Sequence, residues 1–158
     1  MGPARLRRSH VASRGNKWGT AWSWPSPESE KVMFKGIFCP SITITDDEGK
    51  IDYDLWGKHL DHLADAGVNG VLLFGSIGEF YSVSLADKEA ALEFAVKRVG
   101  ERMKVFAGVG DTTYANVIEF TKFAEKAGAD AVLAVSPYYF GPSPLTAENY
   151  FGGIAEAT

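Results

Sequence analysis

The feature that most constrains the fold is a regular alternation, from Lys35 onward, of short apolar runs with longer amphipathic stretches. Residues 70–74 contain no polar side chain, which is typical of a strand that is buried on both faces. Similar runs at 36–45, 104–109 and 131–135 also predict strands. Strands that alternate with helices need crossover connections, so the pattern predicts an α/β domain with a parallel sheet.

The stretches between these runs show helical periodicity, because their apolar residues recur three, four or seven positions apart. Ser84, followed by Asp87, predicts the start of the second helix, and Gly67 and Gly128 predict the ends of the first and third. A fourth helix is predicted over 146–157. The predicted stripes are Tyr53, Trp56, Leu60 and Leu63, then Leu92, Ala95, Val96 and Val99, then Val117, Phe120, Ala124 and Ala127.

An internal repeat supports this organisation. The segment Ala66-Gly-Val-Asn-Gly-Val-Leu-Leu resembles Ala127-Gly-Ala-Asp-Ala-Val-Leu-Ala. The spacing corresponds to about two βα modules of ~30 residues each. Four such modules fit either a small open, doubly wound sheet or the first half of a (β/α)8 TIM barrel, which typically needs ~250 residues. Both architectures bind ligands at the C-terminal ends of the strands.

Charge and composition exclude several classes of protein. The chain has a formal net charge of −4, although residues 1–32 hold six basic and two acidic side chains. The remainder is therefore acidic, which argues against nucleic-acid binding. No run of ~18 or more apolar residues predicts a membrane span. The single cysteine, Cys39, excludes an internal disulfide and a multi-cysteine zinc site, and we expect it to be a small buried strand residue.

Residues 1–32 show neither helical nor strand periodicity and include the run Trp24-Pro-Ser-Pro27. We expect a disordered leader or extension without a catalytic role, with Met33 as the natural start of the domain that covers 33–158. The alternative is a transit peptide, because the first 27 residues contain arginine and no acid. The protein would then be organellar rather than cytoplasmic, which is our first expectation.

Two of the predicted loops at strand C-termini are chemically distinctive. The loop Gly75-Ser-Ile-Gly-Glu79 has two glycines that let backbone N–H groups face a small anion, and Ser76 adds a hydroxyl. It fits neither the Walker nor the dinucleotide pattern. The second loop, Ser136-Pro-Tyr-Tyr-Phe140, offers phenols for proton relay. A plain turn in the first loop and aromatic packing in the second are the structural alternatives.

These motifs together resemble the dihydrodipicolinate synthase / N-acetylneuraminate lyase family from about Met33 to Thr158. The resemblance rests on Phe34-Lys-Gly-Ile, Gly75-Ser-Ile-Gly-Glu79, Ala107-Gly-Val-Gly110, the second copy of the repeat, and Pro137-Tyr-Tyr139, in matching order and spacing. It favours the first four βα units of a TIM barrel over the open sheet. It also implies a homo-oligomer and no cofactor.

The resemblance implies a Schiff-base aldolase or lyase, in which a lysine forms an imine with pyruvate or a larger 2-oxo acid. Residues Gly75, Ser76, Ile77, Gly78 and Glu79 would bind the substrate carboxylate. Ser76 and Tyr139 would be catalytic, as members of a tyrosine proton relay. Ile77 departs from the family's usual threonine, and this departure favours 2-keto-3-deoxy sugar acids as substrates.

The family's Schiff-base lysine should follow Thr158, so we expect this chain to be a fragment that is inactive alone. Other lysines do not replace it, since Lys104 opens a strand at the wrong end of the barrel. Lys58, Lys88, Lys97, Lys122 and Lys126 lie on predicted helices, where we expect them to be solvated. The alternatives are a non-catalytic half-barrel that acts through association and a small anion-binding α/β protein.

No metal site is predicted. His59 and His62 lie three positions apart on the first predicted helix, but no third ligand clusters near them. We expect an exposed helical face there. The run Asp46-Asp-Glu48 is expected to be a solvated turn.

Overall fold

The computed structural model describes residues 34–138, 141 and 143–158. The chain divides into two units, Met1–Met33 and Phe34–Thr158, and the fold described below is that of the second unit. The predicted leader, residues 1–32, lies outside the described residues, so its disorder stays a prediction.

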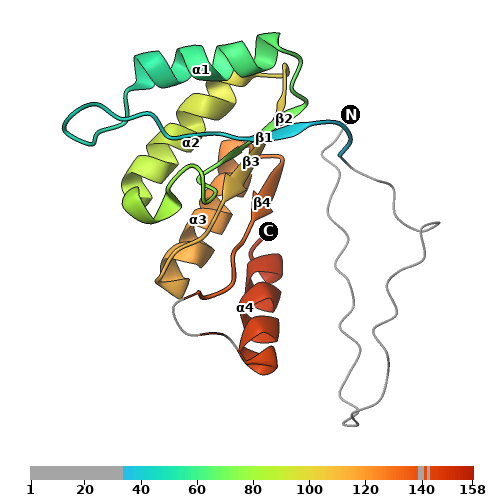
Figure 1. Cartoon of the computed structure of the whole chain (residues 1–158). Helices are drawn as coiled ribbons and strands as arrows, with labels where there is room; N and C mark the ends of the chain where they lie inside the picture. Colours follow the sequence, from blue (N-terminus) through green and yellow to red (C-terminus); the bar gives the residue numbers. More distant parts are fainter. Residues whose placement is uncertain (1–33, 139–140, 142) are drawn as a thin grey trace. The chain divides into compact units, whose positions relative to one another are not determined.

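A four-stranded parallel sheet forms the centre of the domain (Figure 1). The strands follow one another in the sheet in sequence order, β1-β2-β3-β4. Their bounds are β1 Phe38–Pro40, β2 Gly70–Leu73, β3 Lys104–Gly108 and β4 Ala131–Leu133. Because right-handed crossovers that always advance in one direction put every helix on the same face, this order is that of a barrel segment and not of a doubly wound sheet.

The helices occupy the stretches that the periodicity predicted. They are α1 Tyr53–Asp65, α2 Leu85–Val99, α3 Tyr114–Ala127 and α4 Pro144–Glu156. A short 3-10 helix, η1 Phe80–Ser82, was not predicted. Ser84 caps α2 as predicted, because its hydroxyl accepts a hydrogen bond from the Asp87 N–H. Gly67 and Gly128 follow α1 and α3 with φ of +79° and +89°, the left-handed conformation that favours glycine after a helix.

All four predicted strands are shorter in the structure, where β3 ends at Gly108 and β4 at Leu133. Of the apolar run at 36–45, only Phe38–Pro40 pairs as β1. Pro40 is the last residue of β1, and the Ser41 N–H after it still donates to the Leu72 carbonyl at 2.9 Å. The run at 70–74 ends at Leu73, because Phe74 adopts φ +54° and leaves the strand direction.

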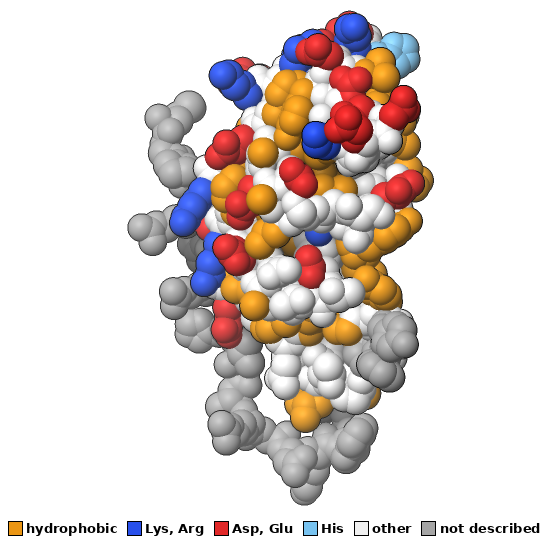
Figure 2. Space-filling model, turned by 90° about the vertical axis from the view of Figure 1, so that its left-hand side faces the viewer, with side chains coloured by type: hydrophobic (Ala, Val, Ile, Leu, Met, Phe, Trp, Pro, Cys, Tyr) orange, Lys and Arg blue, Asp and Glu red, His pale blue; other side chains and the backbone are white. Residues whose placement is uncertain are grey.

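The core lies between the sheet and the apolar faces of the helices. Trp56 and Leu60 of α1, Val71 of β2, Leu92 of α2 and Phe120 of α3 are each at most 2% exposed. Burial of each such side chain contributes about 1.5–3 kcal/mol. Charged side chains of both signs lie on the outer side of α1, α2 and α3 (Figure 2). Cys39, expected to be buried, is only partly buried in β1.

Candidate active site

The predicted anion-binding loop is a compact turn at the C-terminal end of β2. Two non-glycine residues have a positive φ in this turn, Phe74 at +54° and Glu79 at +51°. The Glu79 N–H donates to the Ser76 carbonyl at 3.2 Å, and the Phe80 N–H donates to the Gly75 carbonyl at 3.4 Å. These bonds close the loop into a turn before η1 begins.

Close packing requires the glycines at two positions of this site. A Cβ on Gly78 would lie 2.9 Å from the Ser41 carbonyl oxygen and 3.0 Å from the Phe74 nitrogen. A Cβ on Gly108, at the end of β3, would collide with the Phe74 carbonyl. Both neighbours are backbone, which cannot move aside cheaply. The two glycines therefore allow the segments that follow β1 and β2 and the end of β3 to pack closely together.

Three consecutive backbone N–H groups of the loop have no acceptor in the described part of the chain. The N–H groups of Ser76, Ile77 and Gly78 donate no hydrogen bond to another described residue. The loop is fixed from the β1–α1 side instead, where the Thr43 hydroxyl donates to the Gly78 carbonyl at 2.7 Å. Successive N–H groups in a turn form a concavity that suits a carboxylate or a phosphate.

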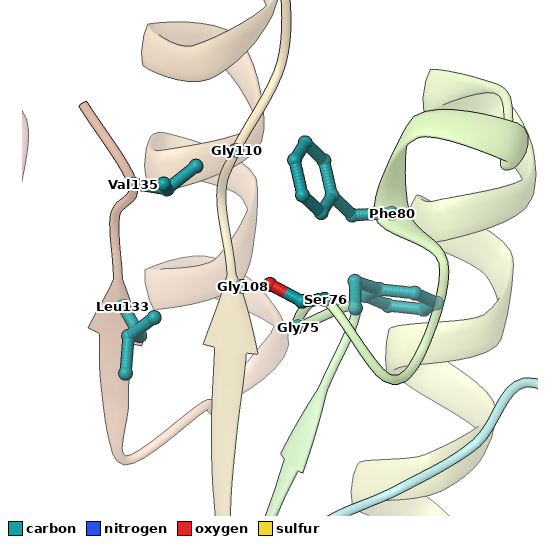
Figure 3. Close-up of a pocket in the computed structure, with 8 residues that line it drawn as sticks. Gly75, Ser76, Phe80, Gly108, Gly110, Leu133 and Val135 are labelled. Carbon is teal, nitrogen blue, oxygen red and sulfur yellow. The ribbon is translucent and has the colours of Figure 1, made fainter. Parts of the chain in front are cut away.

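A small cavity of about 30 Å³ adjoins this loop (Figure 3). Its walls include Gly75, Ser76, Phe80, Gly110 and Val135, which come from the ends of β2, β3 and β4. Figure 3 shows Ser76 and Phe80 on one side of β3, and Leu133 and Val135 on the other. The volume matches about one water molecule, so the cavity suits a small polar group such as one end of a larger ligand.

The structure places the predicted site residues unequally. Ser76 and Ile77 are exposed, Gly75 and Gly78 are buried in the turn, and Glu79 is exposed without a side-chain bond to a described residue. Tyr139, the predicted relay residue, lies outside the described residues. The preceding Tyr138 is half-exposed, with its ring edge-on to the Phe80 ring and the centroids 5.9 Å apart.

Lys88 contradicts the expectation that it is solvated. Its side chain is 2% exposed, and its ammonium donates to the Gly110 carbonyl at 3.2 Å. The Asp111 carboxylate lies 3.7 Å away. Burial lowers the pKa of Lys88, and Asp111 raises it in part. The missed signal was spacing: Lys88 lies four positions before Leu92, in line with the buried stripe of α2.

The other helical lysines named in the sequence analysis are exposed, as predicted. They are Lys58, Lys97, Lys122 and Lys126, and Lys104 is exposed as well. Lys104 stands at the N-terminal end of β3, away from the loop site, and pairs with Asp130 at 2.6 Å. None of these five lines the cavity.

Within the described ranges, no group of three or more His, Cys, Asp or Glu side chains could hold a metal ion. Both histidines were predicted to lie on an exposed helical face. His62 is exposed, as predicted, but His59 is partly buried. No helix in the described part of the chain is both long and apolar enough to cross a bilayer.

Sequential parallel strands, with a glycine-rich loop at their C-terminal ends, define a segment of a (β/α)8 barrel with a candidate site built from loops. The model of the dihydrodipicolinate synthetase family matches residues 33–158. The chain belongs to this family, and the predicted fold, the first four βα units of the barrel, is confirmed.

Relatives and solved structures agree with this assignment. The 4-hydroxy-tetrahydrodipicolinate synthase of Methanococcus maripaludis is 35% identical over 123 residues, which cover 78% of this chain and 42% of that protein. YagE of Escherichia coli, provisionally named a 2-dehydro-3-deoxy-D-gluconate aldolase, is 33% identical over 128 residues, which cover 81% of this chain and 42% of that protein. This chain therefore spans less than half the length of these curated relatives.

The crystal structure of dihydrodipicolinate synthase from Aquifex aeolicus matches with a TM-score of 0.75 and 32% identity, over 79% of this chain and 42% of that one. The structure of YagE in complex with pyruvate matches with a TM-score of 0.77 and 33% identity, over 80% of this chain and 42% of that one. The backbone similarity thus extends over nearly all of the second unit.

Proposed function

We propose that this chain provides the carboxylate-binding half of a Schiff-base aldolase or lyase that acts on a 2-oxo acid. Membership of the dihydrodipicolinate synthetase family supports the reaction class. The observation that carries the proposal is the loop 75–78. The N–H groups of Ser76, Ile77 and Gly78 have no acceptor among the described residues, and Gly75 and Ser76 of the same loop line a small cavity.

Carboxylate binding follows from the chemistry of this loop. A carboxylate offers only acceptors, and the loop offers N–H donors from Ser76, Ile77 and Gly78. Hydrogen bonds to a charged acceptor are worth about 1.5–3 kcal/mol each. The Ser76 hydroxyl adds a fourth donor and, together with Tyr139, is proposed to relay protons during the reaction.

The substrate class is proposed from Ile77. Its side chain is 58% exposed at the loop tip and brings no hydroxyl to the carboxylate. The similarity to YagE supports 2-keto-3-deoxy sugar acids as substrates, and pyruvate would then be the fragment shared by all of them. We also propose that the protein is cytoplasmic and that it forms a homo-oligomer.

Imine formation needs a neutral lysine amine at the substrate ketone, with loss of water as the C=N bond forms. The described lysines do not provide it. Lys88 is buried, but its ammonium bonds to the Gly110 carbonyl, and the others are exposed away from the cavity. We propose that the chain alone binds the 2-oxo acid without covalent capture.

Isothermal titration of the chain with pyruvate tests both parts of the proposal. Saturable binding is expected, and Gly78→Ala should weaken it roughly tenfold or more, because the new Cβ displaces the donors. The matched control is Gly152→Ala on α4, where a Cβ would meet nothing within 4 Å.

Borohydride added to the same samples should leave the mass of the chain unchanged. Two results would contradict the proposal. One is an absence of pyruvate binding to the folded chain. The other is a borohydride-fixed adduct on any of its lysines, which would show that the chain holds its own imine-forming residue.

A further inference from the structure

Lys88 stands out because a lysine is almost never fully buried unless it is paired. It lies in the second turn of α2 with its side chain 2% exposed, on the same stripe as Leu92, Ala95 and Val99. Desolvating its ammonium is costly, so the packing around it must provide compensating contacts. A residue retained at such cost calls for an explanation beyond helix stability.

The contacts of the ammonium lead to the proposed active site. It donates to the carbonyl of Gly110 at 3.2 Å, and it lies 5.8 Å from the centroid of the Phe80 ring. Gly110 and Phe80 both line the cavity beside the carboxylate-binding loop. A cation at this distance over an aromatic face is attracted to it.

Gly110 and Phe80 also pack on each other. A Cβ on Gly110 would lie 3.0 Å from the Phe80 ring and 2.9 Å from Val135. The Phe80 N–H in turn bonds to Gly75 at the start of the loop. A displacement of Lys88 would therefore move Gly110 and Phe80, and through Phe80 it would move the loop 75–78.

Asp111 completes the arrangement on the far side of the ammonium. Its Oδ2 lies 3.7 Å from the Lys88 Nζ, and its Oδ1 accepts from the Thr113 N–H at 2.8 Å. Lys88 thus connects α2 to the β3–α3 loop at Gly110, which lines the cavity, and at Asp111, which follows it.

We infer that Lys88 is a positioning residue, whose ammonium holds Gly110 and Phe80 and thereby fixes the shape of the carboxylate-binding loop. This inference rests on the proposed function, because it assumes that the loop binds a 2-oxo acid. Lys88 does not touch the substrate, and its role is to keep the N–H groups of 76–78 aligned.

The test compares three variants of the whole chain. Lys88→Met keeps an unbranched side chain that is one heavy atom shorter and removes the charge, and Lys88→Arg keeps a cation. Lys97→Met is the matched control, because Lys97 is an exposed lysine on the same helix. Pyruvate affinity is measured by titration, folding by circular dichroism, and the shape of the loop by amide shifts in ¹⁵N–¹H spectra without ligand.

Lys88→Met should weaken pyruvate binding roughly tenfold, since small misplacements of binding groups are costly. It should also shift the amide signals of Phe80, Gly110 and 76–78, while Gly128 stays in place. Lys88→Arg should recover most of the affinity, and Lys97→Met should behave as the unaltered chain. Unaltered binding by folded Lys88→Met, or an equal loss in Lys97→Met, would overturn the inference.

If Lys88→Met does not fold, Phe80→Leu decides the question. It keeps the ammonium and removes the ring that links it to the cavity, so weaker pyruvate binding supports the inference and unaltered binding overturns it. If the unaltered chain binds no pyruvate, the proposed function fails. The amide shifts then still decide whether Lys88 positions the loop.

Discussion

At the scale of single residues, Phe74 shows how the site is built. Its ring is 1% exposed and lies among aromatic neighbours, 6.4 Å from Trp56 and 6.0 Å from Phe120 between centroids. Its backbone has φ +54°, an uncommon value for a bulky residue that costs of order 1–3 kcal/mol. The packed ring holds the backbone in this state and so directs Gly75–Gly78 out of the strand.

The residue-scale prediction concerns Ser76→Ala. Because the proposed donors to the carboxylate are mainly backbone N–H groups, removal of the hydroxyl should weaken pyruvate binding by less than about threefold. Titration of the variant beside Gly78→Ala makes the comparison. If Ser76→Ala costs as much affinity as Gly78→Ala, the hydroxyl rather than the backbone is the main donor.

At the scale of secondary-structure elements, α2 links stability to the site. Its first turn begins at Ser84, whose hydroxyl accepts from the Asp87 N–H at 3.2 Å and donates to the Asp87 carboxylate. Its second turn holds Lys88 behind the cavity. The position of Lys88 therefore depends on where the helix starts.

Ser84→Ala should lower the free energy of unfolding by about 1 kcal/mol, because it removes the N-cap acceptor. Urea denaturation followed by circular dichroism measures this loss. Ser82→Ala is the matched control, since Ser82 is exposed and its hydroxyl makes no hydrogen bond with a described residue. Equal losses in both variants would show that the cap contributes nothing specific.

At the scale of the whole domain, Asp61 ties α1 to the end of α2 and to the turn that follows it. Its carboxylate pairs with Arg98 at 2.5 Å and with Arg102 at 2.6 Å. Hydrogen bonds from Arg98 and Arg102 lower the pKa of Asp61 from 3.8 to about 2. A lowered carboxyl pKa stabilises the fold above the unfolded pKa, and this stabilisation is lost as the pH falls through the folded value.

The unaltered chain should therefore lose thermal stability between about pH 4 and pH 2 by more than Asp61→Asn does. Melting temperatures at pH 7, 4 and 3 measure the difference, and the gap between the two proteins should narrow toward the acid end. The effect should be small, because pairs of partly exposed charges are weak. Parallel pH profiles would contradict it.

Much of this molecule follows from local sequence patterns. The strand–helix alternation, the Ser84 cap and the glycines after α1 and α3 each depend on a few consecutive residues, and all are found where they were predicted. The loop at Gly75 was identified for the same reason, because its glycines mark a turn next to a buried strand. The predicted lengths of all four strands were wrong, since strand pairing and the φ of Phe74 are set by neighbours distant in sequence.

By itself, the sequence determined the order of the elements and the α/β class of the fold, because hydrophobic period and turn residues act over short distances. Only the tertiary structure decided that the Lys88 ammonium meets the Gly110 carbonyl and that Gly108 must remain a glycine. It also brought the ends of β2, β3 and β4 around one cavity. These facts depend on which side chains meet across packed elements, and spacing along one chain does not contain that information.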